Sequence, residues 1–428
     1  MDKYEVKPLK EQKDIIVEVP GSKSITNRAL LMAALSQGQV LLKGALFSDD
    51  SRYFLKALKE LGFSVEVNEH NKTVLVQGLD GKIPKQEGTI YVGSAGTAAR
   101  FLTAMLGLSG GSYEIQASEQ MKKRPMRELF EALEHLGTKF EYLENEYFLP
   151  VKVLGRKAKP GKCKVSLDIS KTSQPLSALL MTGVMLKDGL EICVTGKKKG
   201  GAYVDITTRM MSTFGCDTKF DGQTYRVTEN SFYHIKEYQI EPDVSAACYF
   251  YGIAAITGGS AIVKNVHMDT LQGDIKFLDV LSQMGCTVCD TDLGAKVSSP
   301  KDGILHGIEI DMNNFSDQAL TMAVVSLFAD SPVTIRNVSH IRLQECDRIH
   351  AIAENMRRLG IVCQERDDGV TVYPGPSQAA EIETYEDHRV AMAFTMAGLV
   401  RPGITILNPM CCRKTFENYY DVIESLYK

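Results

Sequence analysis

The stretch that decides the fold is Pro20–Leu31, which reads Pro-Gly-Ser-Lys-Ser-Ile-Thr-Asn-Arg-Ala-Leu-Leu. An apolar segment, Ile15–Val19, runs directly into Pro-Gly, a dipeptide typical of turns, and predicts a strand. Ser22 and Ser24 are residues that favour helix N-caps, and the apolar run Ala29–Leu35 predicts the helix that follows. The sequence therefore predicts a strand, a turn and a helix with a polar beginning.

The first turns of this predicted helix carry Lys23, Ser24 and Arg28. Backbone N–H groups have no partner in the first turn of a helix, and the helix dipole is positive there. Cationic and hydroxyl side chains at such an end form a site for an anion. The alternative is a capped surface helix with solvated charges, and the strand-turn-helix pattern alone does not separate the two.

The same pattern recurs six times, which makes the chain a repeat. A strand and then a charged amphipathic helix follow each buried helix, and a predicted β-hairpin leads into the next unit except in the sixth, where the chain ends. One unit cannot cover its own buried helix, so the units must pack together; the pattern is α+β, with three units in each of two domains. The predicted helices open at Ser24, Gly96, Ser173, Asp243, Ser316 and Glu386, and five amphipathic helices end at Leu61-Gly62, Leu136-Gly137, Phe214-Gly215, Met284-Gly285 and Leu359-Gly360, where glycine fits the residue after a helix.

The bulk composition of the 428 residues is that of a globular protein with two domains, and we expect the boundary near Tyr238–Glu241. A net charge of −4 argues against a nucleic-acid partner. No apolar run is long enough to span a membrane and the N-terminus has no signal-peptide pattern, so we expect a cytoplasmic protein without a membrane partner. The ten cysteines lie mostly in apolar runs, and Cys286-Thr-Val-Cys289 lacks a second pair, so no metal site is expected.

The polar residues at the helix openings differ between the two halves of the chain. A site that binds anions and moves protons needs both kinds, whereas each residue by itself fits an ordinary N-cap. The first half offers Lys23, Ser24, Arg28, Ser94, Thr97, Arg100, Thr172, Ser173 and Gln174, and the second offers Asp243, Asp317, Glu386, Asp387, His388 and Arg389.

Pro20–Leu31 resembles the signature of the 5-enolpyruvylshikimate-3-phosphate (EPSP) synthase family. Similar motifs of that family occur in order along the chain: Gly93–Arg100, Lys122–Met126, Lys171–Gln174, Asp311–Asp317, His340–Arg348 and Glu386–Arg389. The resemblance implies the two-domain enolpyruvyl transferase fold, an inside-out α/β barrel with three units in each domain. It implies domains 21–240 and 1–20 plus 241–428, with the first strand crossing into the C-terminal domain.

The resemblance also implies a reaction and its residues: the enolpyruvyl group of phosphoenolpyruvate moves to the 5-hydroxyl of shikimate 3-phosphate, through a tetrahedral ketal, on the route to chorismate and the aromatic amino acids. It implies a monomer that needs no metal or organic cofactor and is a glyphosate target. Implied catalytic residues are Asp317, Glu345 and Lys23. Implied contacts to shikimate 3-phosphate are Lys23, Ser24, Arg28, Thr172, Ser173, Gln174, Tyr203, Asp317, His340 and Gln344. Implied contacts to phosphoenolpyruvate are Lys23, Gly96, Arg124, Gln174, Arg348, Arg389 and Lys414.

Two alternatives remain open from the sequence. The UDP-N-acetylglucosamine enolpyruvyl transferases share the fold, but they begin with Lys-Asn and usually carry a reactive cysteine after the second unit; here the pair is Lys23-Ser24, and Gly107–Leu129 has no cysteine. A catalytically inactive, anion-binding homologue is the second alternative. Gln344 and His340, which replace a lysine and an asparagine of the family, motivate it, whereas the presence of the three catalytic residues argues against it.

Overall fold

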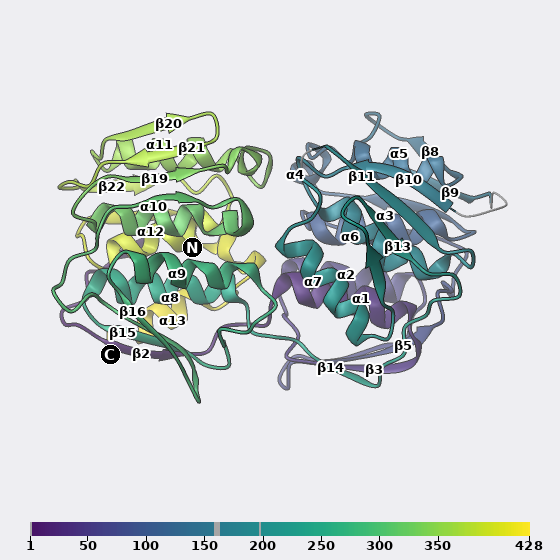
Figure 1. Cartoon of the computed structure of the whole chain (residues 1–428), viewed down its shortest axis with the longest axis horizontal. Helices are drawn as coiled ribbons and strands as arrows, with labels where there is room; N and C mark the ends of the chain where they lie inside the picture. Colours follow the sequence, from purple (N-terminus) through teal and green to yellow (C-terminus); the bar gives the residue numbers. More distant parts are fainter. Residues whose placement is uncertain (1, 158–162, 197) are drawn as a thin grey trace. The chain divides into compact units, whose positions relative to one another are not determined.

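The computed structural model describes residues 2–157, 163–196 and 198–428. The chain divides into two compact units, Gly21–Ile240 (the N-terminal unit) and Met1–Pro20 with Glu241–Lys428 (the C-terminal unit) (Figure 1). Each unit contains three copies of the repeat.

The N-terminal unit begins with the helix that the signature stretch predicts. Its first copy has α1 (Lys23–Leu35), β3 (Gln37–Lys43), α2 (Asp49–Glu60), β4 (Val65–Asn68) and β5 (Thr73–Leu79). The second has β6 (Glu87–Tyr91), α3 (Gly96–Leu108), β7 (Ser112–Gln116), α4 (Glu119–Lys122), α5 (Arg127–His135), β8 (Thr138–Tyr142) and β9 (Val151–Arg156). The third has β10 (Cys163–Asp168), α6 (Gln174–Thr182), the 3₁₀ helix η1 (Gly183–Met185), β11 (Leu190–Thr195), α7 (Ala202–Thr213), β12 (Thr218–Phe220) and β13 (Thr224–Val227), and β14 (Glu237–Gln239) follows.

The C-terminal unit repeats this order after the two N-terminal strands β1 (Lys3–Val6) and β2 (Asp14–Val17). Its first copy has α8 (Val244–Thr257), β15 (Ser260–Val263), η2 (Gly273–Ile275), α9 (Lys276–Gln283), β16 (Thr287–Thr291) and β17 (Gly294–Ser298). The next has β18 (Glu309–Asp311), η3 (Asn313–Gln318), α10 (Ala319–Val325), η4 (Ser326–Phe328), β19 (Val333–Arg336), η5 (Ser339–Leu343), α11 (Arg348–Arg358), β20 (Cys363–Arg366) and β21 (Gly369–Val372). The last has β22 (Ala380–Ile382), α12 (His388–Gly398), β23 (Ile404–Leu407), η6 (Pro409–Lys414) and α13 (Tyr419–Ser425).

Five of the sheets share one strand order, in which a parallel pair is followed by a hairpin. These sheets are β14-β3-β5-β4, β6-β7-β9-β8, β10-β11-β13-β12, β2-β15-β17-β16 and β18-β19-β21-β20. Strand β2, which precedes α1 in sequence, pairs in parallel with β15, with Asp14 opposite Ser260 and Val17 opposite Val263. In return β14, which precedes α8, pairs in parallel with β3. The first sheet of each unit therefore contains a strand from outside its own copy: β14 follows the third copy of the N-terminal unit, and β2 precedes α1.

The sixth sheet, β22-β23-β1, contains a strand that the sequence analysis did not predict. In the described part of the chain, η6 and α13 follow β23 in place of a hairpin. Instead β1 pairs antiparallel with β23, with Lys3 opposite Leu407 and Val6 opposite Ile404. The N-terminal strand thus occupies the position that a hairpin strand holds in the other five sheets, and its residues Tyr4 and Val6 are buried.

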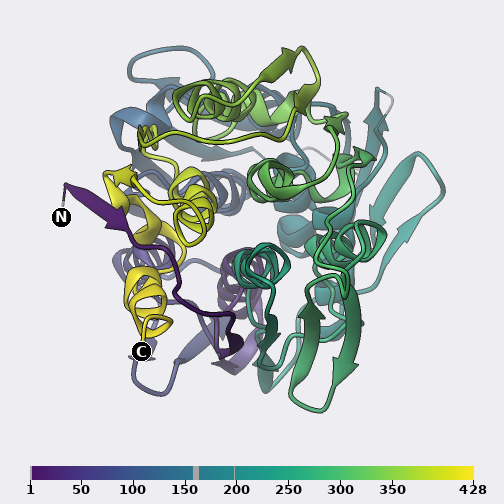
Figure 2. The same cartoon turned by 90° about the vertical axis from the view of Figure 1, so that its left-hand side faces the viewer.

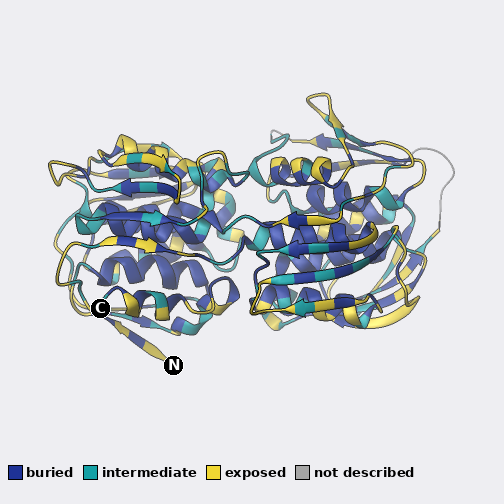
Figure 3. Ribbon diagram, turned by 90° about the horizontal axis from the view of Figure 1, so that it is seen from below, coloured by how far each residue is buried: buried dark blue, intermediate teal, exposed yellow. Residues whose placement is uncertain are grey.

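Each unit has a core of three helices that are buried on all sides. In the N-terminal unit these helices are α1, α3 and α6, and in the C-terminal unit they are α8, α10 and α12. Figure 2 views the C-terminal unit nearly along its helices, with α8, α10 and α12 inside and the amphipathic helices α9, α11 and α13 farther out. In Figure 3 the inner helices are uniformly buried, whereas exposed residues lie on strands, loops and outer helices.

The predicted ends of the amphipathic helices are confirmed by the backbone. The five glycines that follow α2, α5, α7, α9 and α11 are Gly62, Gly137, Gly215, Gly285 and Gly360, and their φ angles lie between 74° and 105°. Only glycine adopts this left-handed conformation without strain, so it ends each helix after the bulky apolar residue that packs inward.

Three helix beginnings differ from the predictions. Ser22 occupies the N-cap position of α1, but neither it nor Ser24 makes a capping side-chain bond, since α1 already begins at Lys23. The fifth buried α-helix begins at Ala319 rather than Ser316, because the residues up to Gln318 form the 3₁₀ helix η3, which is kinked at Phe315 (φ −143°, ψ 42°). The sixth begins at His388, because Glu386 has a left-handed φ of 56° and Asp387 provides the cap.

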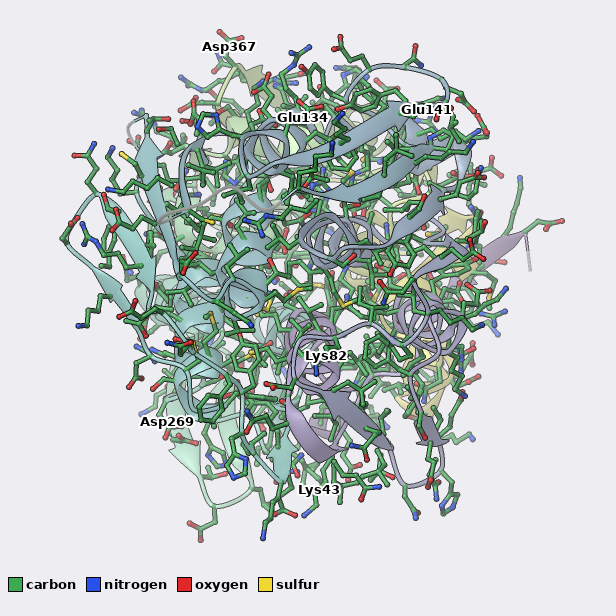
Figure 4. All side chains as sticks on the ribbon, turned by 90° about the vertical axis from the view of Figure 1, so that its right-hand side faces the viewer. Lys43, Lys82, Glu134, Glu141, Asp269 and Asp367 are labelled. Carbon is green, nitrogen blue, oxygen red and sulfur yellow. The ribbon has the colours of Figure 1, made fainter. Side chains whose placement is uncertain are left out.

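The surface carries charges of both signs. In Figure 4 the exposed side chains of Lys82 and Glu141 point outward, as do those of Asp269 and Asp367. Within the described ranges of the chain, no helix has the length and apolar character that crossing a membrane requires.

Candidate active site

In the N-terminal unit, Lys23 is the first residue of α1 and lies close to a buried acid. Its Nζ is 3.9 Å from Oδ2 of Asp50, a residue of α2 that is 2% exposed. The sequence analysis missed Asp50, because an acidic residue in the first turn of a helix is already explained by the helix dipole. The pair places a carboxylate beside a lysine that was predicted to be catalytic.

Arg28, also on α1, is a buried cation whose described partners are all neutral. It is 2% exposed and donates to Oγ1 of Thr207 (2.8 Å) and to the backbone carbonyl of Tyr203 (3.1 Å). It also donates to the carbonyl of Ser24 (2.9 Å) and to Oγ of Ser177 (3.3 Å). Burial lowers its pKa to about 10. Because no carboxylate pairs with this charge among the described residues, an incoming anion would be the first to neutralise it.

The three buried helices of this unit begin without a side-chain cap. The residues at their N-cap positions, Ser22, Ala95 and Ser173, accept no capping bond, although Oγ1 of Thr172 accepts from the N–H of Gln174 at 3.3 Å. In the C-terminal unit, by contrast, Asp243 caps α8 and Asp387 caps α12. The N-terminal unit thus keeps backbone N–H groups available for an anion, whereas carboxylates already cap two of the three buried helices of the other unit, α8 and α12.

Thr172, Ser173 and Tyr203 come from two loops that leave the same sheet edge. The first two follow β10 and the third follows β11, and these strands are parallel neighbours with Asp168 opposite Thr195. Tyr203 is tied to Arg28 by its carbonyl and by its ring, whose centroid lies 5.9 Å from Cζ of Arg28. The fold therefore brings hydroxyl, aromatic and cationic groups of the predicted acceptor site to one end of the unit.

Gly96 and Arg124, predicted to contact phosphoenolpyruvate, are packed against each other. A Cβ built on Gly96 would lie 2.6 Å from Nη1 and 2.8 Å from Cζ of Arg124. Arg100 connects the two loops, since it donates to the carbonyls of Gly96 and Pro125, each at 3.0 Å. The absence of a side chain at residue 96 thus gives the guanidinium its position.

In the C-terminal unit, Arg348 is the centre of a buried charge cluster. It begins α11, is 2% exposed and makes a bidentate contact with Asp387, with Nε 2.7 Å from Oδ2 and Nη2 3.2 Å from Oδ1. It also donates to Asp317 and to Glu345, each at 3.0 Å. Although burial opposes it, the charges of these acids hold the pKa of Arg348 above its usual value.

The two predicted catalytic carboxylates each lie between two cations. The second oxygen of Asp317 accepts from Nη2 of Arg389 at 2.9 Å. The second oxygen of Glu345 accepts from Nζ of Lys414 at 3.1 Å. The structure therefore brings five of the predicted residues of this half into one cluster, although they come from widely separated parts of the sequence.

Of the two residues that depart from the family motif, Gln344 contacts Arg348 at the centre of this cluster, and His340 contacts the residue before Asp317. The carbonyl oxygen of the Gln344 side chain accepts a hydrogen bond from Nη1 of Arg348. Nε2 of His340 lies 2.8 Å from Oγ of Ser316, the residue before Asp317. The neighbouring Arg342 forms ion pairs with Asp347 (2.8 Å) and Glu365 (3.0 Å), so its charge is directed to those acids.

Asp274 is a further acid of this region that no sequence pattern indicated. It is 7% exposed, and its Oδ2 accepts hydrogen bonds from Oγ of Ser245 and from Nε2 of Gln318 (3.2 Å). Burial, followed by the charge of Asp317, raises its pKa to about 6. Within the described parts of the chain, no group of three or more His, Cys, Asp or Glu residues is arranged to hold a metal ion.

The chain is similar to known proteins over nearly its whole length. The family model of EPSP synthase (3-phosphoshikimate 1-carboxyvinyltransferase) matches residues 7–423. A relative from Trichormus variabilis named 3-phosphoshikimate 1-carboxyvinyltransferase is 42% identical over 421 residues, 98% of each chain. The chloroplastic enzyme of that name from Arabidopsis thaliana is 38% identical over 446 residues, covering 99% of this chain and 84% of that one.

The solved structure of EPSP synthase from Acinetobacter baumannii has the same fold. It superposes with a TM-score of 0.83 at 23% identity and covers 100% of this chain and 98% of that chain. This match confirms the predicted two-domain enolpyruvyl transferase fold. From the family model over nearly its whole length and from these relatives, the chain belongs to the EPSP synthase family.

Proposed function

We propose that this chain transfers the enolpyruvyl group of phosphoenolpyruvate to the 5-hydroxyl of shikimate 3-phosphate and releases phosphate. The relatives that carry the name of this reaction support the proposal. The structural observation that carries it is the position of Asp317 and Glu345, each between two buried cations. Groups that can move protons thus lie directly beside groups that can bind a phosphate and a carboxylate.

Phosphoenolpyruvate is a polyanion, and its binding would rearrange the cluster. Its oxygens compete with Asp317 for Arg389 and with Glu345 for Lys414. A carboxylate that loses a neighbouring cation holds a proton more tightly, so binding of this substrate would raise the pKa of both acids. The proposed contacts are Lys23, Gly96, Arg124, Gln174, Arg348, Arg389 and Lys414.

Shikimate 3-phosphate would bind in part through donors that pair with no carboxylate among the described residues. Arg28 is the strongest of these, because its buried charge is surrounded by neutral acceptors. The uncapped N-termini of α1 and α6 add backbone N–H donors for the phosphate. The proposed contacts are Lys23, Ser24, Arg28, Thr172, Ser173, Gln174, Tyr203, Asp317, His340 and Gln344.

The reaction requires proton transfers in both of its stages, the addition and the elimination. In the addition, the 5-hydroxyl loses its proton as its oxygen bonds to C2 of phosphoenolpyruvate, and C3 gains a proton to become a methyl group. In the elimination, the methyl group loses a proton, the carbon–carbon double bond forms again and phosphate leaves C2. We assign Asp317, Glu345 and Lys23 to these transfers as a coupled set, without a separate step for each.

We further propose that the two compact units are the two domains of the family, 21–240 and 1–20 plus 241–428, a division that the backbone contacts support. We also propose a monomer in the cytoplasm, where all ten cysteines, which are unpaired in the structure, would stay reduced. Light scattering of the purified protein and fractionation of cells test these two statements.

The test of the activity is phosphate release from phosphoenolpyruvate with each acceptor. We expect release with shikimate 3-phosphate and none with UDP-N-acetylglucosamine. Turnover of the nucleotide sugar would favour that transferase, and turnover of neither acceptor would favour an inactive homologue; the comparisons favour neither alternative. Substitution of Asp317 by Asn or Glu345 by Gln in the active protein should abolish release without unfolding it.

A further inference from the structure

Lys198 lies in the loop between β11 and α7 and belongs to none of the family motifs described above. It is only partly exposed, and its ammonium has no hydrogen bond or ion pair with any residue that the structure describes. Burial lowers its pKa, with no neighbouring acid to oppose that effect. A desolvated ammonium without a partner is unfavourable in the free protein, and this is the observation that needs an explanation.

The side chain of Lys198 is held against the beginning of α7. Its Cε lies 3.3 Å and its Nζ 3.8 Å from the position that a Cβ on Gly201 would occupy. Gly201 is the N-cap residue of α7, provides no side-chain cap and has a φ of 144° that favours glycine. The ammonium therefore lies beside the positive end of a helix, where a second positive charge is unfavourable unless an anion is bound.

The next lysine in the loop is different. Lys199 donates to the carbonyl of Val194 at 2.6 Å. Asp168, the last residue of the neighbouring strand β10, has a lowered pKa, chiefly through hydrogen bonds from Ser170 and then through the charges of Lys171 and Lys199. Asp168 thus already has other partners, and among the described residues no carboxylate pairs with Lys198.

Lys198 is also on the same side of the unit as the proposed acceptor site. It follows β11, and Thr172 and Ser173 follow the parallel neighbour β10, so both loops leave one sheet edge. The loop of Lys198 leads directly into α7, whose first turn presents Tyr203, and the carbonyl and ring of this tyrosine contact Arg28. Two cations that pair with no carboxylate of the described chain, Arg28 and Lys198, therefore flank the first turn of α7.

We propose that Lys198 is a further binding residue of this chain and that its ammonium contacts the phosphate of the acceptor substrate. The inference rests on the proposed function for the identity of that substrate. It adds to the proposed set a charged donor that the motifs do not contain. A dianionic phosphate would neutralise both cations and accept bonds from the uncapped N–H groups of α7.

The experiment measures binding by calorimetry rather than turnover. Lys198→Met should weaken binding of shikimate 3-phosphate about tenfold or more, because a charge-assisted hydrogen bond is lost. The same variant should leave binding of shikimate, which lacks the phosphate, unchanged. Lys198→Arg should retain most of the affinity for shikimate 3-phosphate, since the charge remains.

Lys164→Met is the matched control, because Lys164 lies in the same unit, is exposed and pairs with Glu191 at 3.0 Å. It should not change binding of either compound. Thermal unfolding of the free protein gives a second readout: Lys198→Met should be at least as stable as the wild type, since an unfavourable charge is removed, but should gain less stability from shikimate 3-phosphate.

Wild-type affinity for shikimate 3-phosphate in Lys198→Met would overturn the inference, and so would an equal loss for shikimate and its phosphate. These results are separate from a failure of the proposed function. If the wild type binds shikimate 3-phosphate but releases no phosphate from phosphoenolpyruvate, the proposed reaction fails while the role of Lys198 in binding is still measured.

Discussion

The charge cluster around Arg348 makes a quantitative prediction for Asp387→Asn. Arg348 is 2% exposed and Asp387 is completely buried, so solvent screens their bidentate contact very little. Removal of one partner of a buried ion pair costs about 3–5 kcal/mol, because the remaining charge loses its compensation. Here Asp317 and Glu345 still contact Arg348, so we expect a loss at the lower end, about 3 kcal/mol.

Asparagine separates the charge of residue 387 from its capping role. The Asp387 side chain also accepts from the N–H of Arg389 at 2.9 Å, and an asparagine oxygen can keep this helix cap. Asp387→Asn therefore tests the ion pair, whereas Asp387→Ala removes the pair and the cap together and should cost about 1 kcal/mol more. For a unit of this size, about 3 kcal/mol corresponds to a fall of roughly 6–12 °C in the unfolding temperature.

The assay is calorimetric unfolding of the wild type and the two variants, together with the Michaelis constant for phosphoenolpyruvate. Asp269→Asn, which removes an exposed acid of the same unit, is the control and should leave both quantities unchanged. Asp387→Asn should also raise the Michaelis constant, since Arg348 loses the group that fixes its orientation. An unfolding temperature equal to that of the wild type would refute the argument that Arg348 needs Asp387.

Three further predictions follow from single residues. Asp274 has a pKa of about 6 in the folded protein, above its usual value, so its contribution favours the fold at low pH and is lost as the pH rises through about 6. The unfolding free energy of the wild type should therefore fall by about 3 kcal/mol between about pH 4 and about pH 7, and Asp274→Asn should remove this fall. A difference between variant and wild type that does not change with pH would contradict this. Gly96→Ala should displace Arg124 and raise the Michaelis constant for phosphoenolpyruvate more than that for shikimate 3-phosphate; an equal rise in both would argue against this packing role. Gln344→Lys should give little gain in affinity for shikimate 3-phosphate, because the positive charge of the new ammonium would be repelled by the guanidinium of Arg348. Gln344→Met is the neutral control. A clear gain in affinity for the lysine variant alone would show that the native site lacks a charge.

The repeat was predictable because each unit carries its own local signals. Glycine after an amphipathic helix has a conformational reason that does not depend on the rest of the fold, and all five such positions have the expected φ. The beginning of α12 was not predictable in the same way. Tyr385 and Glu386 both have left-handed φ angles, which these residue types rarely adopt and which only the surrounding structure can impose.

The same difference between local signals and long-range contacts explains which site residues could be predicted. Arg348, Asp317 and Glu345 could be named because the resemblance included their motifs, but sequence reasoning could not show that one guanidinium joins both acids to Asp387. Asp50 and Asp274 were missed for a physical reason: each has an ordinary explanation in its local sequence, and only burial beside another charged group distinguishes it. Strand β1 was missed because its partner lies at the opposite end of the chain.

That long-range pairing has a consequence for synthesis of the chain on the ribosome. Strands β1 and β2 are made before their partners β23 and β15, which follow only after the whole segment 21–240. The N-terminal unit is continuous in sequence and can fold during its synthesis. Strands β1 and β2, by contrast, stay unpaired with exposed apolar faces until their partners β23 and β15 have been made. Contacts of such sequence separation form slowly, and exposed strands invite aggregation in the interval. A circular permutant that begins at Gly21 and joins residue 428 to residue 1 would remove this delay, because β1 and β2 would then be made after the strands with which they pair.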